Sequence, residues 1–110
     1  MSEKDLKIKT GVLRRYLQEA NSYKSEVQKQ STKIAAMKES QEPDQYMIKK
    51  ALEVQQENQQ MFCLASKNVQ KARIDLEALL TSSQENGELK TNAQEIIQKA
   101  LEFENTSNSF

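Results

Sequence analysis

Apolar residues recur every seven positions through most of this chain. Between residues 3 and 40 the repeat has companion positions three residues further on, so the side chains would form one stripe along a helix, as in coiled coils. The sequence therefore predicts a long amphipathic helix here. The repeat consists of Leu6, Leu13, Ala20, Val27 and Ile34, with Tyr16, Tyr23 and Met37 as the companions.

A second seven-residue repeat occupies residues 43–83. Gln55 and Asn58 interrupt it, and around them an additional apolar line lies one position earlier in the repeat. This line would widen the apolar stripe until the helix touches two neighbours, which a two-helix hairpin would not require. The main repeat consists of Ile48, Phe62, Val69 and Leu76 with Ala51, Ala65, Ala72 and Leu79, and the additional line of Met47, Val54 and Met61.

One proline and one glycine mark the breaks between helices. Pro43 fits the first turn of a helix, where no backbone N–H is needed, and Gly87 fits the left-handed conformation that ends many helices. We expect helices over residues 3–40, 43–83 and 88–104, and a frayed tail over 105–110. The third helix would pack through Leu89, Ala93, Ile96, Ala100 and Phe103, with Ile97 and Leu101 beside them.

These segments predict an all-α fold, an elongated antiparallel three-helix bundle with coiled-coil-like packing. Short connections at the two breaks make consecutive helices antiparallel, up-down-up, within a single domain spanning residues 1–110. The third helix would be less than half as long as the others. One end of the rod would then carry only two helices, and a second copy of the chain could pair with the apolar side chains left uncovered there.

Charge is balanced overall but distributed unevenly along the 110 residues. Nine basic and five acidic side chains give residues 1–40 a net charge of +4, whereas residues 41–83 carry −1 and residues 84–110 carry −3. Nucleic-acid-binding domains usually have a strongly basic face and a pI above about 9. The pI of 6.3 therefore argues against a nucleic-acid partner.

The residue types that catalysis and metal binding most often use are scarce. The chain has no histidine, the commonest general base and metal ligand, and no glycine-rich phosphate loop. We therefore expect no enzyme, no metal and no cofactor. Cys63 is the only cysteine, which predicts an ordinary free thiol in a reducing compartment such as the cytosol. The sequence also lacks a membrane span and the apolar region of a secretory signal.

The basic start of the first helix is one candidate binding surface. Lys4, Lys7, Gly11 and Arg14 are spaced so that they lie on one side of the helix. A partner backbone could approach the glycine there while partner carboxylates meet the cations. The alternative is a solvated face with a glycine that costs about 1 kcal/mol relative to alanine. Spacing alone favours the solvated face.

The second helix offers another candidate surface. Cys63 and Ile74 are eleven residues apart, about three helical turns, so they share a line that passes near Lys67 and Lys71. The pair Lys49-Lys50 would extend this patch, whose mixture of cations and apolar groups would suit a large, partly folded client. The alternative is a set of isolated exposed apolar residues, which are normal on protein surfaces.

Two short motifs resemble those of a known family. The first, Lys7-Ile8-Lys9-Thr10-Gly11, precedes a basic and apolar helix, and the second, Tyr46-Met47-Ile48-Lys49-Lys50, opens the next helix. In this order and separation, the chain resembles the tubulin-binding cofactor A family from about Leu6 to Leu80. The resemblance implies a three-helix bundle that holds β-tubulin folding intermediates without nucleotide or metal. It also implies a cytoplasmic, cytoskeleton-associated location.

The resemblance reverses the preference for a solvated face at the start of the first helix, because tubulin is strongly acidic. Other tubulin-folding cofactors would be further partners, and a helical adaptor of vesicle-fusion machinery, with an open apolar groove, is the alternative function. One departure is that Met61-Phe62-Cys63-Leu64-Ala65 lacks a proline that family members often carry there, so the family's kink is not implied. The expected partner-binding residues are Lys4, Lys7, Lys9, Gly11, Arg14, Lys49, Lys50, Lys67, Lys71 and Ile74.

Overall fold

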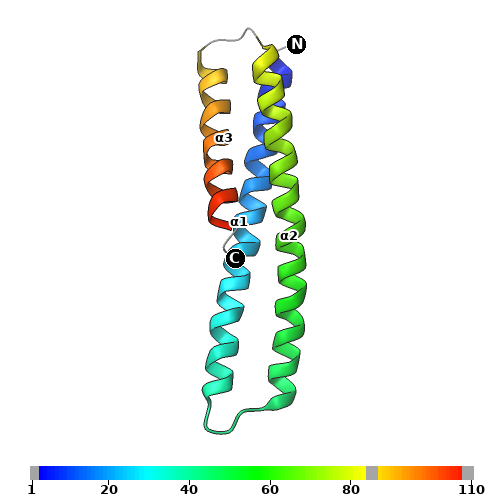
Figure 1. Cartoon of the computed structure of the whole chain (residues 1–110), viewed down its shortest axis with the longest axis vertical. Coiled ribbons are helices and arrows are strands. Elements are labelled where there is room, and N and C mark those ends of the chain that lie inside the picture. Colours follow the sequence, from blue (N-terminus) through cyan, green and yellow to red (C-terminus); the bar gives the residue numbers. More distant parts are fainter. Residues whose placement is uncertain (1–2, 84–86, 108–110) are drawn as a thin grey trace.

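The computed structural model describes residues 3–83 and 87–107, which form three α-helices. Helix α1 spans Glu3–Glu39, α2 spans Gln45–Ser82 and α3 spans Glu88–Ser107. In Figure 1 they run down, up and down along a rod of 64 × 18 × 17 Å, so that consecutive helices are antiparallel. The expected elongated antiparallel three-helix bundle is confirmed.

Helix α2 begins two positions after the proline. Asp44 is its N-cap, and the Asp44 carboxylate accepts a hydrogen bond of 3.1 Å from the Met47 N–H. Such a cap satisfies a backbone donor that the first helical turn leaves unpaired. Pro43 therefore precedes the cap, and the expectation that it lies in the first turn is wrong. The helix then continues without a break through residues 61–65.

Gly87 lies immediately before α3, which begins at Glu88, and it does not end α2. Helix α2 already ends at Ser82, where the Ser83 N–H donates to the Leu80 carbonyl. Gly87 has a φ of 93°, a conformation that suits a residue without Cβ, and its carbonyl accepts hydrogen bonds from the N–H and the hydroxyl of Thr91.

Helix α3 is longer than the sequence indicates. It has 20 residues against 38 in α2, so the expectation of less than half the length is wrong. Residues 105–107 continue the helix, which contradicts the expected frayed tail at those positions, and residues 108–110 lie outside the described chain. The lower half of the rod nevertheless carries only α1 and α2, as expected (Figure 1).

The core follows the main seven-residue repeats. All five repeat positions of α1 are buried, and the companions Tyr16 and Tyr23 pack against the core partly buried. In α3, Ala93, Ile96, Ala100 and Phe103 are buried, and Leu89, Ile97 and Leu101 are half-buried. The buried apolar residues are Leu6, Leu13, Leu17, Ala20, Val27, Ile34, Ile48, Ala51, Phe62, Ala65, Val69, Ala72, Leu76, Ala93, Ile96, Ala100 and Phe103.

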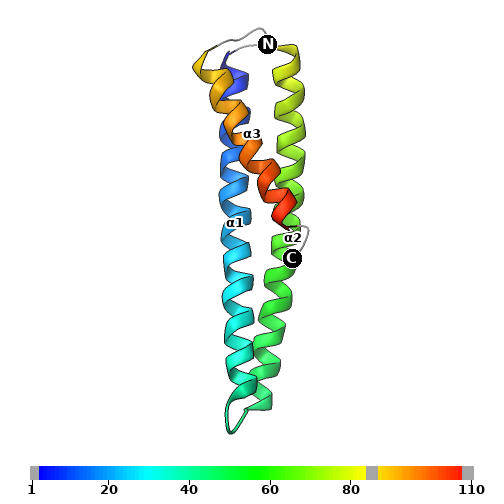
Figure 2. The same ribbon diagram turned by 60° about the vertical axis from the view of Figure 1, so that its left-hand side comes forward.

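The additional apolar line of α2 is exposed, which contradicts the prediction that it touches a second neighbour. Figure 2 shows α3 crossing one face of the α1–α2 pair. Arg73 makes its contact with α3 on that face, and Leu52 lies three heptads before it on the same helical line. Met47, Val54 and Met61 fall on the opposite edge of the α2 seam, where α3 does not lie.

Amide side chains join α1 to α2 in the two-helix half. The Gln30 side chain donates to the Ala51 carbonyl at 3.1 Å, and the Gln55 side chain donates to the Ser31 hydroxyl at 2.6 Å. Gln55 occupies a core position of the repeat, so these bonds account for the interruption that the sequence shows there. The hairpin therefore keeps its register partly through polar contacts.

The C-terminal part of α3 is held by an aromatic pair and an ion-pair network. Phe103 packs edge to face on Phe62, with ring centroids 6.0 Å apart. The Arg73 guanidinium donates to the Glu104 carboxylate at 2.5 and 3.1 Å and also contacts Glu77. Hydrogen bonding to Glu104 raises the pKa of Arg73 against the opposing effect of burial. Lys24 adds a contact to the Phe103 ring.

Truncation of the α1 seam should destabilise the bundle. Leu13 is fully buried, so Leu13→Ala should lower the free energy of unfolding by about 2–5 kcal/mol through lost packing. Leu64→Ala removes the same atoms from an exposed position and serves as the control. Urea denaturation followed by circular dichroism measures both, and equal losses would contradict the assigned core.

The ion-pair network should stabilise the docking of α3. Glu104→Gln leaves a guanidinium that is only 14% exposed with a weaker partner, so we expect a loss of about 1–3 kcal/mol and faster hydrogen exchange in α3. Glu77→Gln alters a carboxylate that is 43% exposed and should cost less. If both variants exchanged like the unmodified chain, the network would not hold α3.

Candidate partner-binding surface

The face turned away from α3 contains two adjoining hollows between α1 and α2. The one nearer the rod end is about 500 Å³ and the next about 260 Å³, and Lys9 and Asp75 line both. No described residue of α3 lines either hollow. We call this surface the open groove, and define it by Asp5, Ile8, Lys9, Val12, Tyr16, Asn68, Lys71, Ala72, Asp75, Ala78 and Leu79.

Three of the predicted site residues on α2 come together beside the open groove. Lys67, Lys71 and Ile74 line a common shallow hollow, which Asp75 also borders. Since Lys71 and Asp75 belong to the open groove as well, the two surfaces are continuous. The predicted patch around Ile74 and the predicted Lys9 therefore belong to one face of the molecule.

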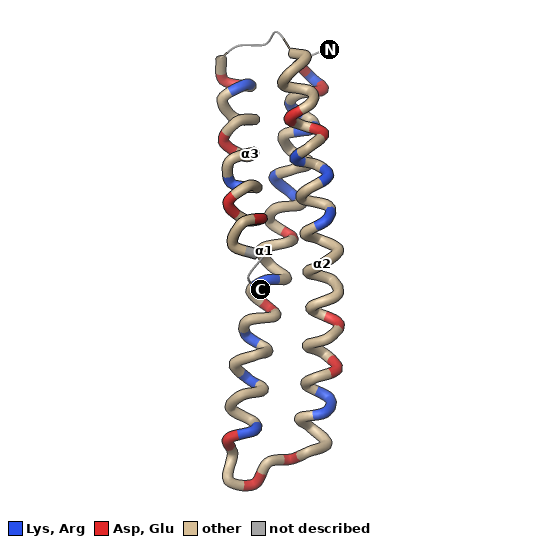
Figure 3. The backbone as a smooth tube through the Cα atoms, viewed as in Figure 1, with Lys and Arg blue, Asp and Glu red and all other residues tan. Residues whose placement is uncertain are grey.

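The cations of this face have no internal partners within the described chain. Lys9, Lys67 and Lys71 are exposed, and none of them lies within ion-pair distance of a described carboxylate. Figure 3 shows basic positions of this half on all three helices, and α3 carries more acidic than basic residues. Unpaired cations beside exposed apolar groups are suited to a partner with carboxylates and some apolar surface.

The basic start of α1 divides between two faces. Lys4, Lys7, Gly11 and Arg14 keep their helical spacing on the outer side of α1, where the three cations are exposed and Gly11 is half-buried. Lys9 lies instead in the open groove. These residues therefore do not form a single contact surface.

Lys49 and Lys50 do not extend the α2 patch, contrary to expectation. They lie near the start of α2, in the two-helix half, and 17 residues of helix separate Lys50 from Lys67, which is roughly 26 Å. Lys50 is also engaged locally, because it pairs with Glu53 and lies 5.5 Å from the Tyr46 ring centroid.

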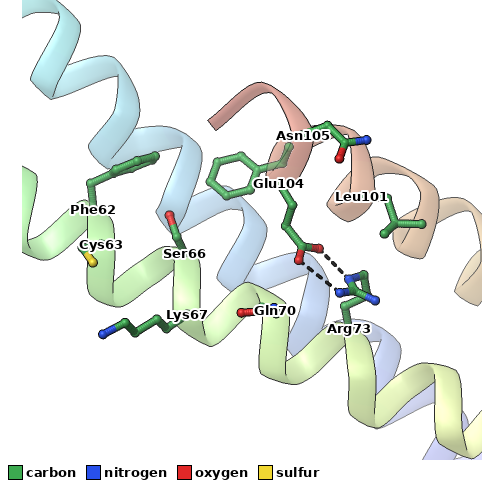
Figure 4. Close-up of a pocket in the computed structure, with 10 residues that line it drawn as sticks. Phe62, Cys63, Ser66, Lys67, Gln70, Arg73, Leu101, Glu104 and Asn105 are labelled. Atoms are coloured by element: carbon green, nitrogen blue, oxygen red, sulfur yellow. Dashed lines mark hydrogen bonds and ion pairs between the residues drawn. The ribbon is translucent and has the colours of Figure 1, made fainter. Parts of the chain in front are cut away.

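Cys63 is exposed and lies on the other side of Lys67 from Ile74. It borders a hollow of about 490 Å³ between α2 and the end of α3, with Leu101 and Glu104 on the α3 side (Figure 4). Lys67 lines this hollow as well as the one around Ile74. The thiol thus lies on the α3 side of α2, away from the open groove.

Neither a metal centre nor a membrane helix emerges from the described residues. Within residues 3–83 and 87–107 there is no group of three or more Cys, Asp and Glu side chains that could hold a metal ion. None of the described helices is both long and apolar enough to cross a membrane.

Several residues of the open groove were not predicted from the sequence. Ile8 was noted only within a motif, and Val12, Asn68 and Asp75 were not singled out for binding. A signal for two of them exists, because Asn68 and Asp75 continue the seven-residue line of Met61 and so lie on the edge of α2 away from α3.

The fold and this surface define a helical binding protein, a rod that offers side chains along its length rather than an enclosed site. The model for the family described as tubulin binding cofactor A matches residues 1–102. The chain therefore belongs to the tubulin binding cofactor A family.

Relatives and solved structures agree with this assignment. The tubulin-specific chaperone A proteins of Mus musculus and Gallus gallus are 35% and 37% identical over 82 residues, covering 74% of this chain and 75% of each relative. Tubulin folding cofactor A from Arabidopsis thaliana has a TM-score of 0.85 at 27% identity, over 91% of this chain and 95% of that one. A β-tubulin-binding post-chaperonin cofactor has a TM-score of 0.84 at 27% identity, over 92% and 98%.

Gly11 should be replaceable by alanine without steric conflict. It lies inside α1, and a Cβ at this position would meet no atom within 4 Å. Gly11→Ala should therefore raise the free energy of unfolding by about 1 kcal/mol through the higher helix propensity of alanine. Thermal unfolding followed by circular dichroism measures the change, and a lower stability would show that the glycine is required by the fold.

Proposed function

We propose that this chain is a tubulin-folding cofactor, which binds β-tubulin folding intermediates after their release from the chaperonin and before assembly of the αβ heterodimer. The observation that carries the proposal is the family match over residues 1–102, supported by the similarity to a β-tubulin-binding post-chaperonin cofactor over 92% of the chain. The family match favours this function over a helical adaptor of vesicle-fusion machinery.

The open groove and the lysines beside it are the contact surface that we propose for β-tubulin. Lys9, Lys67 and Lys71 are available for the carboxylates of an acidic partner, and Ile8 and Ile74 supply apolar contacts nearby. The outer cations Lys4, Lys7 and Arg14, with Gly11 between them, are a second contact on α1. In this proposal the chain acts by stoichiometric binding, without catalysis.

The proposed place of action is the cytoplasm, in association with the cytoskeleton. This follows from the client, because a chaperone of β-tubulin acts where tubulin is folded and assembled. Contact with other tubulin-folding cofactors, and self-association of the chain, remain predictions that sedimentation measurements with the purified proteins can test.

Reversal of the charges of Lys67, beside the open groove, and Lys71, within it, should weaken binding to β-tubulin. The double variant Lys67→Glu/Lys71→Glu should lower the affinity for purified β-tubulin about tenfold or more, because like charges would then face an acidic partner. Sedimentation velocity of β-tubulin with and without the chain measures the affinity. Failure of the unmodified chain to bind β-tubulin would refute the proposed function.

A matched control carries the same charge reversal on α3. Lys90→Glu/Lys99→Glu changes the net charge equally on a helix that does not line the open groove, so it should retain binding. The variant Lys7→Glu/Arg14→Glu tests the outer side of α1 in the same assay, where unchanged affinity would remove that side from the contact. An equal loss in the α3 control would mean that only net charge matters.

A further inference from the structure

Helix α2 presents a row of apolar side chains to solvent, which begins in the two-helix half and reaches the level where Phe62 packs on Phe103 of α3. Met47, Val54 and Met61 lie on one line at seven-residue spacing, and Leu64 follows one turn after Met61. All four are exposed, and they are half of the eight large apolar residues that the described chain exposes. We call these four residues the apolar ridge.

The spacing of the apolar ridge is that of a helix–helix contact. Scattered exposed apolar residues are ordinary, but a row that keeps heptad spacing is typical of a seam that packs on another helix. Within the described chain α3 supplies no such helix, because it crosses the other face and ends halfway along the rod (Figure 2). The ridge extends over about 26 Å, roughly five turns of a partner helix.

The apolar ridge is continuous with the open groove. The line of Met47, Val54 and Met61 continues through Asn68 and Asp75, both of which line the groove. A partner that lies in the groove and follows the rod downwards therefore meets the ridge next. The two surfaces would contact the same molecule.

Charges around the ridge differ from those around the groove. The cations of the two-helix half that make ion pairs do so with a carboxylate on their own helix, Lys29 with Glu26 and Lys50 with Glu53. Groove cations have no such partners within the described chain. Lys33, Lys38 and Lys49 of the two-helix half also make no ion pair within the described chain. The difference lies in the ridge itself, which contains no charged side chain and therefore suits an apolar face of a partner. In the groove, Lys9 and Lys71 can meet acidic groups, beside the carboxylates of Asp5 and Asp75.

We propose that the apolar ridge binds an apolar helix face of β-tubulin, the same client whose acidic surface meets the open groove. This inference rests on the proposed function. A folding intermediate that has not yet joined its assembly partner still exposes apolar surface, and the ridge covers part of it. Binding then has two components, a salt-sensitive one at the groove and a salt-insensitive one at the ridge.

Two matched single variants test the inference. Val54 and Leu52 lie two residues apart on α2 and are 46% and 44% exposed, but only Val54 belongs to the ridge. Val54→Gln should weaken the affinity for purified β-tubulin about fivefold or more, and Leu52→Gln should leave it unchanged. The triple variant Met47→Gln/Val54→Gln/Met61→Gln should lose at least about fiftyfold, with circular dichroism and thermal unfolding like those of the unmodified chain.

Salt dependence separates the two components. Binding that remains in the triple ridge variant should weaken as salt is raised, because it depends on the groove cations. Binding that remains in Lys67→Glu/Lys71→Glu should depend less on salt than binding by the unmodified chain, because only Lys9 and the outer cations of α1 remain to meet acidic groups. Full affinity in the triple variant, or an equal loss in Leu52→Gln, would overturn the inference while leaving the proposed function intact.

Two further outcomes would also overturn the inference. If the unmodified chain alone sediments as a dimer that the triple variant dissociates, the ridge is occupied by a second copy and the inference is wrong. If the unmodified chain does not bind β-tubulin at all, the proposed function fails and the inference fails with it. Sedimentation distinguishes both of these outcomes from a loss of β-tubulin affinity that is confined to the ridge variants.

Discussion

The packing of α1 against α2 along seven-residue lines determines which side chains remain outside the bundle. Both helices bury one stripe, which Gln55 and Asn58 interrupt in α2, and Leu13 and Leu76 are among the residues that are wholly enclosed. Helices of this length do not depend on intrinsic propensity alone, since their stability comes mainly from the buried stripe. Once that seam is fixed, every other face of the two helices is available either to α3 or to a partner.

Helix α3 makes the rod asymmetric because it covers one face and only half the length. Its C-terminal part is fixed through Phe103 and Glu104, whose contacts with Phe62 and Arg73 place it on one edge of the α2 seam. The opposite edge then remains open over the whole rod.

The sequence predicted the fold well because heptad spacing is a local signal. The lines through Leu6 and Ile48 identify core positions without any knowledge of topology. Capping was less predictable: Pro43 and Gly87 each marked a break, but both lie just before the helices that follow them. Whether the Met47 line would be covered depends on which side α3 takes, and no short-range pattern contains that information.

The candidate surface was predictable only in part, for the same reason. Lys9 and Lys71 are far apart in sequence and share the open groove because of the hairpin register, whereas Lys7 and Lys9 are close in sequence but lie on different faces. Helical spacing on one element identifies a face, but the neighbour of that face is a tertiary property. Family resemblance supplied the client, and the structure supplied the grouping of the residues.

The hydrogen bonds of Gln30 and Gln55 between α1 and α2 help to fix how the two helices are aligned along the rod. A slip of α1 along α2 would separate Gln55 from Ser31 and Gln30 from the Ala51 carbonyl, breaking one exposed and one part-buried hydrogen bond between the helices. The Gln55 carbonyl oxygen already lacks a hydrogen-bond partner within the described chain, so this layer stabilises the hairpin less than an apolar pair would. These hydrogen bonds instead help to fix the register of α1 relative to α2, as single polar residues do in coiled coils. Since register sets which α1 residues lie opposite the ridge and the groove, the interior amides help to define the outer surface.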